Sequence, residues 1–245
     1  MAKQAKTDRQ AVIDSIRKQQ KSADRRRGMA IVAVCGVIGL GIVAAAAWKP
    51  VSDRIEISKY QSTPLSEIGA SAKACGEITL KDATGEQDHV PEGTPMTYED
   101  SPPAFGQHWD LWDTMDRKFY SEKDRPELGE LVHNLEHGYT MLWYDETAAK
   151  DSETMDTLRG IAAKFPSDTN MRDKFKVVPW LEKDGKAFPK GMHIAMTHWS
   201  VGGRGQDAEE KKQGVFQYCS EPSGEALEDF MTKYPYMDSP EPDAI

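Results

Sequence analysis

The 245-residue chain lacks the short motifs that mark the commonest catalytic sites. It contains no G-x-S-x-G nucleophile elbow, no P-loop and no C-x-x-C pair. The zinc-peptidase motif H-E-x-x-H is also absent, because the glutamate of H-N-L-E-H stands at the fourth position. These absences favour a binding or structural role over an enzyme.

Basic residues are scarce outside the N-terminal part of the chain. After Trp48 there are 22 of the 31 lysines and arginines but 37 of the 40 acidic residues, so acidic side chains outnumber basic ones there. The part after Trp48 therefore has a net charge of −15. This charge argues against nucleic acid and anionic lipid headgroups as ligands, since Lys and Arg bind both. It favours cations or basic partners.

Residues 29–48 form a run of 20 positions without a charge. As a helix this run is about 30 Å long, the thickness of a bilayer's hydrocarbon core. Residues 1–28 carry nine basic and three acidic side chains. Because basic flanks stay inside, we expect a cytoplasmic segment at 1–28, a transmembrane helix at 29–48 and an extracytoplasmic remainder.

A cleaved signal peptide is the alternative interpretation, with the small residues at 44–47 as its cleavage site. Both the leading segment and the apolar run are long for a signal peptide, and Trp48 with Lys49 is typical of an interfacial anchor. We therefore predict a single-pass anchor in the cell membrane.

After the run, composition divides the chain into a stalk at 49–74, a globular domain at 75–238 and a loose tail at 239–245. Apolar residues at helical spacing predict helices over 152–165, capped by Ser152, and over 224–234, capped by Ser223. Strands are expected at 138–144, 175–180 and 192–201. This order predicts an α+β domain with a small, mostly antiparallel sheet and flanking helices.

The cysteines fit an extracytoplasmic domain. Cys35 lies in the apolar run, which leaves Cys75 and Cys219 to form a disulfide outside the cytoplasm. The bond would close a loop of about 145 residues, for which chain entropy gives roughly 4 to 5 kcal/mol at most. Alternatively, one of the two cysteines is a metal ligand.

The most distinctive polar group is the pair His133 and His137 in H-N-L-E-H-G. Four positions apart on a helix, their Cβ atoms would lie about 6 Å apart and could share an ion. On a strand the separation of about 13 Å would be too large. A helix from Pro126 to Gly138 would permit the chelate. Alternatively, the histidines are structural residues of the core (polar knots) that form hydrogen bonds with backbone carbonyls.

Other side chains add to this candidate site. His108 follows a rigid turn in S-P-P-A-F-G-Q-H-W, and His89 precedes a proline in D-H-V-P. We therefore predict a metal site formed by His108, His133, Glu136 and His137, with a further histidine possible. Imidazole ligands favour copper or zinc. Three methionines near these histidines hint at copper, unless they only fill the core: Met141, Met192 and Met196.

The motifs S-P-P-A-F-G-Q-H, H-N-L-E-H-G and the late S-P-E-P together resemble the domain-of-unknown-function family three-one-zero-five. Its members are membrane-anchored or secreted proteins common in actinobacteria, and the similarity extends over roughly residues 88–242. The resemblance implies a shared topology and a polar centre at His108, His133, Glu136 and His137, but no activity. Two departures are Phe105 before Gly106 and the pair His198-Trp199, so the resemblance assigns no shared role to His198.

These features predict an envelope protein held by one membrane helix, whose outer domain binds a transition-metal ion, copper or zinc, or docks an envelope protein partner. A metal-dependent envelope hydrolase, with Glu136 polarising a metal-bound water, is one alternative. The other is a structural accessory subunit of a membrane complex.

Overall fold

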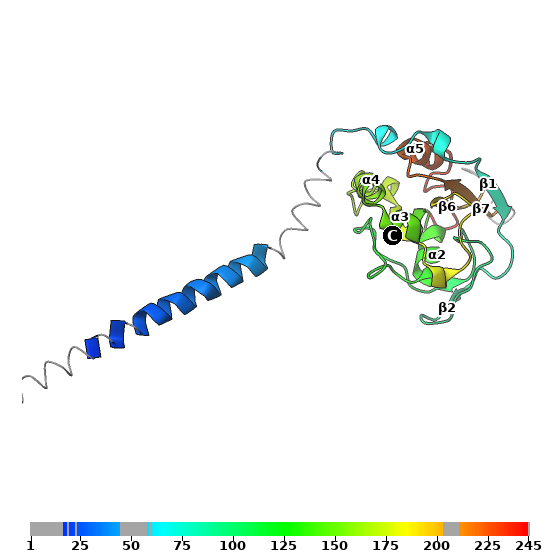
Figure 1. The fold of residues 1–245 in the computed structure, drawn as a ribbon. Helices are drawn as coiled ribbons and strands as arrows, with labels where there is room; N and C mark the ends of the chain where they lie inside the picture. The colour runs from blue at the N-terminus through cyan, green and yellow to red at the C-terminus, as the bar shows by residue number, and fades with distance from the viewer. Residues whose placement is uncertain are drawn as a thin grey trace, which may run out of the picture. The chain divides into compact units, whose positions relative to one another are not determined.

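The computed structural model describes residues 17, 18, 20–22, 24–44, 58, 60–202 and 211–244. It divides into two compact units, Met1–Ile55 and Glu56–Ile245 (Figure 1). In the first unit, a helix over Gln20–Ala44 contains an 18-residue stretch with a mean hydropathy of 2.1. By length and composition this helix could cross a membrane, a test that a signal sequence also passes. Trp48 and Lys49 lie outside the described residues.

A five-stranded sheet organises the second unit (Figure 1). Its order is β1 (Thr79–Asp82), β7 (Gln213–Cys219), β6 (Ile194–Ser200), β4 (Thr140–Tyr144) and β5 (Phe175–Pro179). Neighbouring strands run antiparallel, except for the parallel pair β4–β5. The predicted α+β class with a mostly antiparallel sheet is confirmed.

Alternate side chains of β4 face two separate apolar cores. Leu142 and Tyr144 join a core with residues of α4 (Ser152–Ala162) and α5 (Gly224–Lys233). Met141 and Trp143 join a second core with residues of α2 (Leu128–Glu136). The sheet is therefore buried on both faces, which explains why every residue of β4, β5 and β6 is buried.

The helix caps agree with the sequence in one case and differ in the other. Ser223 caps α5 as predicted, its side chain accepting from the backbone N–H of Ala226. The cap of α4 is Asp151 rather than Ser152, since the Asp151 carboxylate accepts from Thr154 N–H and Ser152 is already helical. An anionic cap at this end also interacts favourably with the helix dipole. Asp145 caps the short α3 (Glu146–Lys150) in the same way.

Cys75 and Cys219 form the predicted disulfide. It joins β7 to a segment with two 3₁₀ turns, η1 (Leu65–Glu67) and η2 (Ala72–Ala74). Between these turns Ile68 is 1% exposed and belongs to the core on the α4–α5 side of the sheet. Residues 60–74, expected as part of a stalk, thus pack against the domain because they supply an apolar side chain to its core.

Two further turns and a small strand pair complete the unit. The turns are η3 (Met171–Asp173) and η4 (Glu182–Asp184). The pair consists of β2 (His89–Val90) and β3 (His108–Trp109), which run parallel with His89 opposite His108. This register brings together two histidines that are 19 positions apart in the chain.

Candidate metal centre

Helix α2 supplies two of the polar side chains of the site. His133 and Glu136 stand three positions apart, so they project from the same side of the helix. A capping box fixes the start of the helix, with Glu130 accepting from Glu127 N–H at 3.1 Å. Gly138 follows the last turn with φ +91°, a conformation that favours glycine. The predicted helix is therefore present but shorter than Pro126–Gly138, and His137, the partner of His133 in the chelate prediction, is its C-cap rather than part of its last turn.

Backbone carbonyls orient two of the histidine rings. The Nδ1 atom of His108 lies 2.8 Å from Gly106 O, and the Nδ1 atom of His133 lies 2.6 Å from Trp109 O. A carbonyl oxygen can only accept, so each Nδ1 carries the proton and donates it. In the neutral ring each Nε2 then has a lone pair. Metal-ligating histidines are held by this same kind of outer hydrogen bond.

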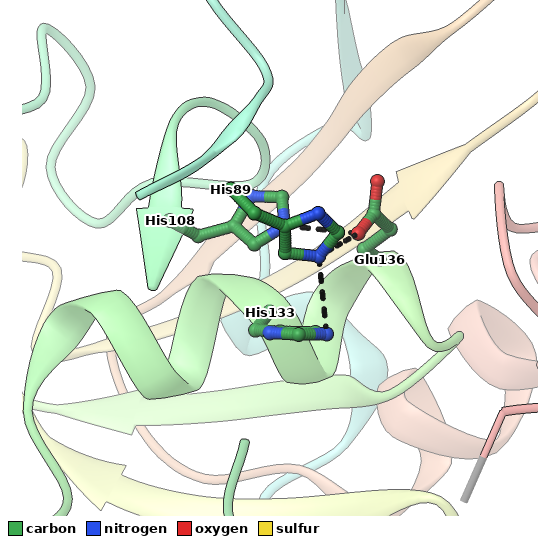
Figure 2. Close-up of side chains that lie close together, drawn as sticks. All are labelled: His89, His108, His133 and Glu136. Atoms are coloured by element: carbon green, nitrogen blue, oxygen red, sulfur yellow. Dashed lines mark hydrogen bonds and ion pairs between the residues drawn. The ribbon is translucent and has the colours of Figure 1, made fainter. Parts of the chain in front are cut away.

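The side chains of His89, His108, His133 and Glu136, which we call the inner cluster, converge on one point (Figure 2). Their ligand atoms all lie within 4.8 Å of one another. The Glu136 Oε2 atom is 2.9 Å from His108 Nε2 and 3.5 Å from His89 Nε2, and His89 Nε2 is 3.4 Å from His133 Nε2. Ligands about 2.1 Å from a tetrahedral zinc ion stand roughly 3.4 Å apart, so these separations suit one ion.

The electrostatics of the inner cluster favour a proton or a metal ion between its members. A carboxylate only accepts hydrogen bonds, and the Nε2 atoms of His108 and His133 have lone pairs when their rings are neutral. Such atoms repel one another at 3 to 3.5 Å, unless an additional proton or a metal ion lies between them. The group is also buried, with only His89 exposed by 40% of its side chain. Water therefore screens the repulsion poorly.

Burial and neighbouring charges shift the pKa values of the α2 side chains. Burial lowers the pKa of His133 and outweighs the opposing hydrogen bond to Trp109 O. For Glu136, burial acts to raise the pKa, but the hydrogen bond and charge of His108 with the charges of His89 and His133 lower it overall. Both shifts favour the deprotonated forms, which are the forms that bind metals.

His137 lies beside the inner cluster rather than within the group of four. Its ring centroid is 4.4 Å from that of His133, and Trp112 packs 5.1 Å from both rings. Burial, followed by the charge of His133, lowers the pKa of His137 to about 3. Its Nδ1 atom is buried and has no hydrogen-bond partner. Its Nε2 atom is 3.7 Å from Glu241 Oε2.

The other candidates from the sequence have different surroundings. Both ring nitrogens of His198 face backbone carbonyls, those of Tyr139 at 3.2 Å and Asp238 at 2.7 Å. Met141 and Met196 are buried in the two apolar cores. The methionine argument for copper therefore gains no support. With three nitrogens and one oxygen as donors, the inner cluster suits a borderline divalent ion such as Zn²⁺ or Cu²⁺.

His89 is the one inner-cluster member absent from the predicted set of four. The sequence marked it only as a histidine before a proline. Its place depends on the two-residue pairing of β2 with β3, which brings His89 level with His108. A strand of two residues has no periodic pattern, so tertiary structure was needed to find this ligand candidate.

Comparisons with known proteins give one match. Neither the curated proteins nor the solved structures contain a significant match to the chain. The model of one family, described as "Protein of unknown function (DUF3105)", matches residues 89–245. The match begins at His89 and includes all four inner-cluster residues as well as His137. The chain therefore belongs to the DUF3105 family of proteins of unknown function.

Proposed function

We propose that this protein is a membrane-anchored metal-binding protein whose outer domain holds one zinc or copper ion at His89, His108, His133 and Glu136. The observation that carries the proposal is the convergence of three imidazole nitrogens and one carboxylate oxygen within 4.8 Å of one another. The sequence prediction adds His137 as a further ligand, and the 4.4 Å between the His133 and His137 ring centroids keeps this assignment open to test.

The alternative interpretation, in which the histidines are structural residues of the core, explains only part of the geometry. Histidines that fasten a fold do bond backbone carbonyls, as His108 and His133 do through Nδ1. A structural role explains the 2.9 Å pair of His108 and Glu136 as an ion pair, but it gives no reason for the ring nitrogens of His89 and His133 to gather at the same point. A metal ion accounts for both sides of each ring, since its ligands need the outer hydrogen bond and the free lone pair.

The anchor and the cysteines support a location of the site outside the cytoplasm. The Gln20–Ala44 helix is apolar enough to span a membrane, and basic residues dominate the segment before it. The Cys75–Cys219 disulfide suits an oxidising compartment. We therefore place the N-terminus in the cytoplasm and the metal-binding domain outside, where it would supply or exchange an ion with an envelope partner.

Metal analysis of the full-length protein tests this function. The protein is extracted from membranes in mild detergent without chelators, and zinc and copper are measured against protein concentration. We expect one ion per chain, and none in the double variant His108→Asn with His133→Asn. The matched control is His193→Asn, because His193 pairs with Asp145 rather than with the inner cluster. A wild-type protein that stays metal-free after incubation with Zn²⁺ and with Cu²⁺ would contradict the proposal.

A further inference from the structure

The C-terminal tail, which the sequence predicted to be loose, is fastened beside the inner cluster. The backbone N–H of Glu241 donates to Glu136 O at 3.0 Å. The Lys174 ammonium, 1% exposed, donates to Pro242 O at 2.7 Å and to Ala244 O at 2.6 Å. Its third hydrogen bond, at 2.7 Å, goes to His137 O at the end of α2. The tail is therefore tied to the last turn of the metal-site helix.

This arrangement fixes one carboxylate against one buried imidazole. Glu241 is half exposed, whereas the His137 side chain is 3% exposed. The 3.7 Å between His137 Nε2 and Glu241 Oε2 is too long for a hydrogen bond. It is close to the roughly 3.4 Å that separates two ligands of one tetrahedral ion with bonds of about 2.1 Å. The unpartnered Nδ1 of His137 leaves that ring without any hydrogen bond of its own among the described residues.

We propose that His137 and Glu241 form an outer position, where an incoming divalent cation is first held before it passes to the inner cluster. The proposal rests on the metal-binding function proposed above. The outer position reaches solvent through Glu241, and its imidazole is the ring neighbour of His133. Two ligands bind an ion more weakly than four, so an ion at the outer position moves inward.

A position on the path acts on rates and leaves the equilibrium unchanged. The same path serves binding and release, so a variant that slows association slows dissociation by the same factor. Ligands of the final site behave differently, because their removal changes the dissociation constant. Rate and affinity measurements on one variant therefore distinguish a path residue from an inner ligand.

The test uses the full-length protein in detergent and Cu²⁺ alone as the probe. Stopped-flow quenching of tryptophan fluorescence gives the association rate, transfer to a chelator gives the dissociation rate, and competition gives the dissociation constant. Trp112, which packs against both His133 and His137, is the reporter closest to the path. The variants are Glu241→Gln and, as a matched control in the same tail with the same charge change, Asp243→Asn.

For Glu241→Gln we expect both rates to fall on the order of tenfold, the lower end of what local charge gives to association, while the dissociation constant and stoichiometry stay unchanged. Asp243→Asn should keep the wild-type rates. If both variants slowed equally, the effect would be general charge attraction, and the outer position would be refuted. Unchanged rates for Glu241→Gln would also refute it. A weakened dissociation constant would make Glu241 an inner ligand and also overturn it. A wild-type protein that binds no Cu²⁺ would instead contradict the function on which the proposal rests.

Discussion

Replacing His133 by asparagine should remove one metal-binding nitrogen and keep the hydrogen bond that orients the side chain. The asparagine amide nitrogen can occupy the place of the imidazole Nδ1, which donates to Trp109 O at 2.6 Å. The Nε2 atom, 3.4 Å from His89 Nε2, has no counterpart in asparagine. The expected effect is therefore a loss of affinity in a domain that still folds.

The size of the loss follows from the number of ligands. Four-ligand structural zinc sites bind with about 10 to 16 kcal/mol, or roughly 3 kcal/mol per ligand. At about 1.4 kcal/mol for each factor of ten, the dissociation constant should rise on the order of 100-fold. His108→Asn should cost a similar amount, because its Nδ1 also donates to a carbonyl and its Nε2 faces Glu136.

Competition against a chelator of known affinity measures this change, and thermal unfolding provides a second measurement. At an ion concentration of 100 times the dissociation constant, binding stabilises the folded protein by about 2.7 kcal/mol. For a domain of this size the melting temperature should rise by roughly 5 to 11 °C in the wild type. His133→Asn should lose most of that rise at the same ion concentration, whereas His193→Asn should keep it. A folded His133→Asn protein with wild-type affinity would refute the ligand assignment.

Three further predictions concern the support of the site, the disulfide and the topology. Gly129→Ala places a Cβ 2.5 Å from Trp109 Cγ and should lower the free energy of unfolding by about 1 to 3 kcal/mol. Because the Trp109 carbonyl that holds His133 is displaced, metal affinity should fall roughly 10- to 100-fold. Unfolding and chelator competition measure the two effects, and wild-type values would contradict this packing. Cys75→Ala with Cys219→Ala opens a loop with a sequence separation of 144 and should lower the free energy of unfolding by about 4 to 5 kcal/mol, with an unchanged denaturation midpoint as the contrary result. Protease added to intact spheroplasts should digest the globular domain and spare a tag at residue 1, and the reverse pattern would invert the proposed orientation.

The fold was predictable where burial leaves a continuous local pattern. Strands β4, β5 and β6 are buried over their whole length and lie within the predicted ranges, and the cap Ser223 was also identified. Strand β7 was missed, because Q-G-V-F-Q-Y-C contains a glycine and no clean alternation. Strand β1 was missed because it is a short edge strand with Leu80 half exposed. Neither contains a local signal as strong as that of the buried strands.

The site was predictable only where one element carries it. The spacing of His133 and His137 indicated a possible chelate on one helix, whereas the structure groups His133 with Glu136 and leaves His137 beside the cluster. His108 required the assumption that a proline-rich turn returns to this helix, and His89 required a strand pair of two residues. Glu241 is nearly at the end of the chain, and its place depends on the buried Lys174. Such long-range contacts leave no trace in local periodicity.

The four inner-cluster residues are supported unequally, and this inequality bears on how the site would function. His108 and His133 are buried and each is held by a backbone carbonyl, while Glu136 is fixed by the last turn of α2. His89 is 40% exposed and stands on a two-residue strand, and its ring contacts are with the inner-cluster members His108, His133 and Glu136. At the proposed site, three pre-positioned side chains would lower the entropy cost of binding, because little would need to be ordered when an ion arrives. A fourth ligand at the solvent edge can detach without disturbing the other three. We therefore expect the proposed site to exchange its ion with a partner rather than to retain it permanently for structural purposes.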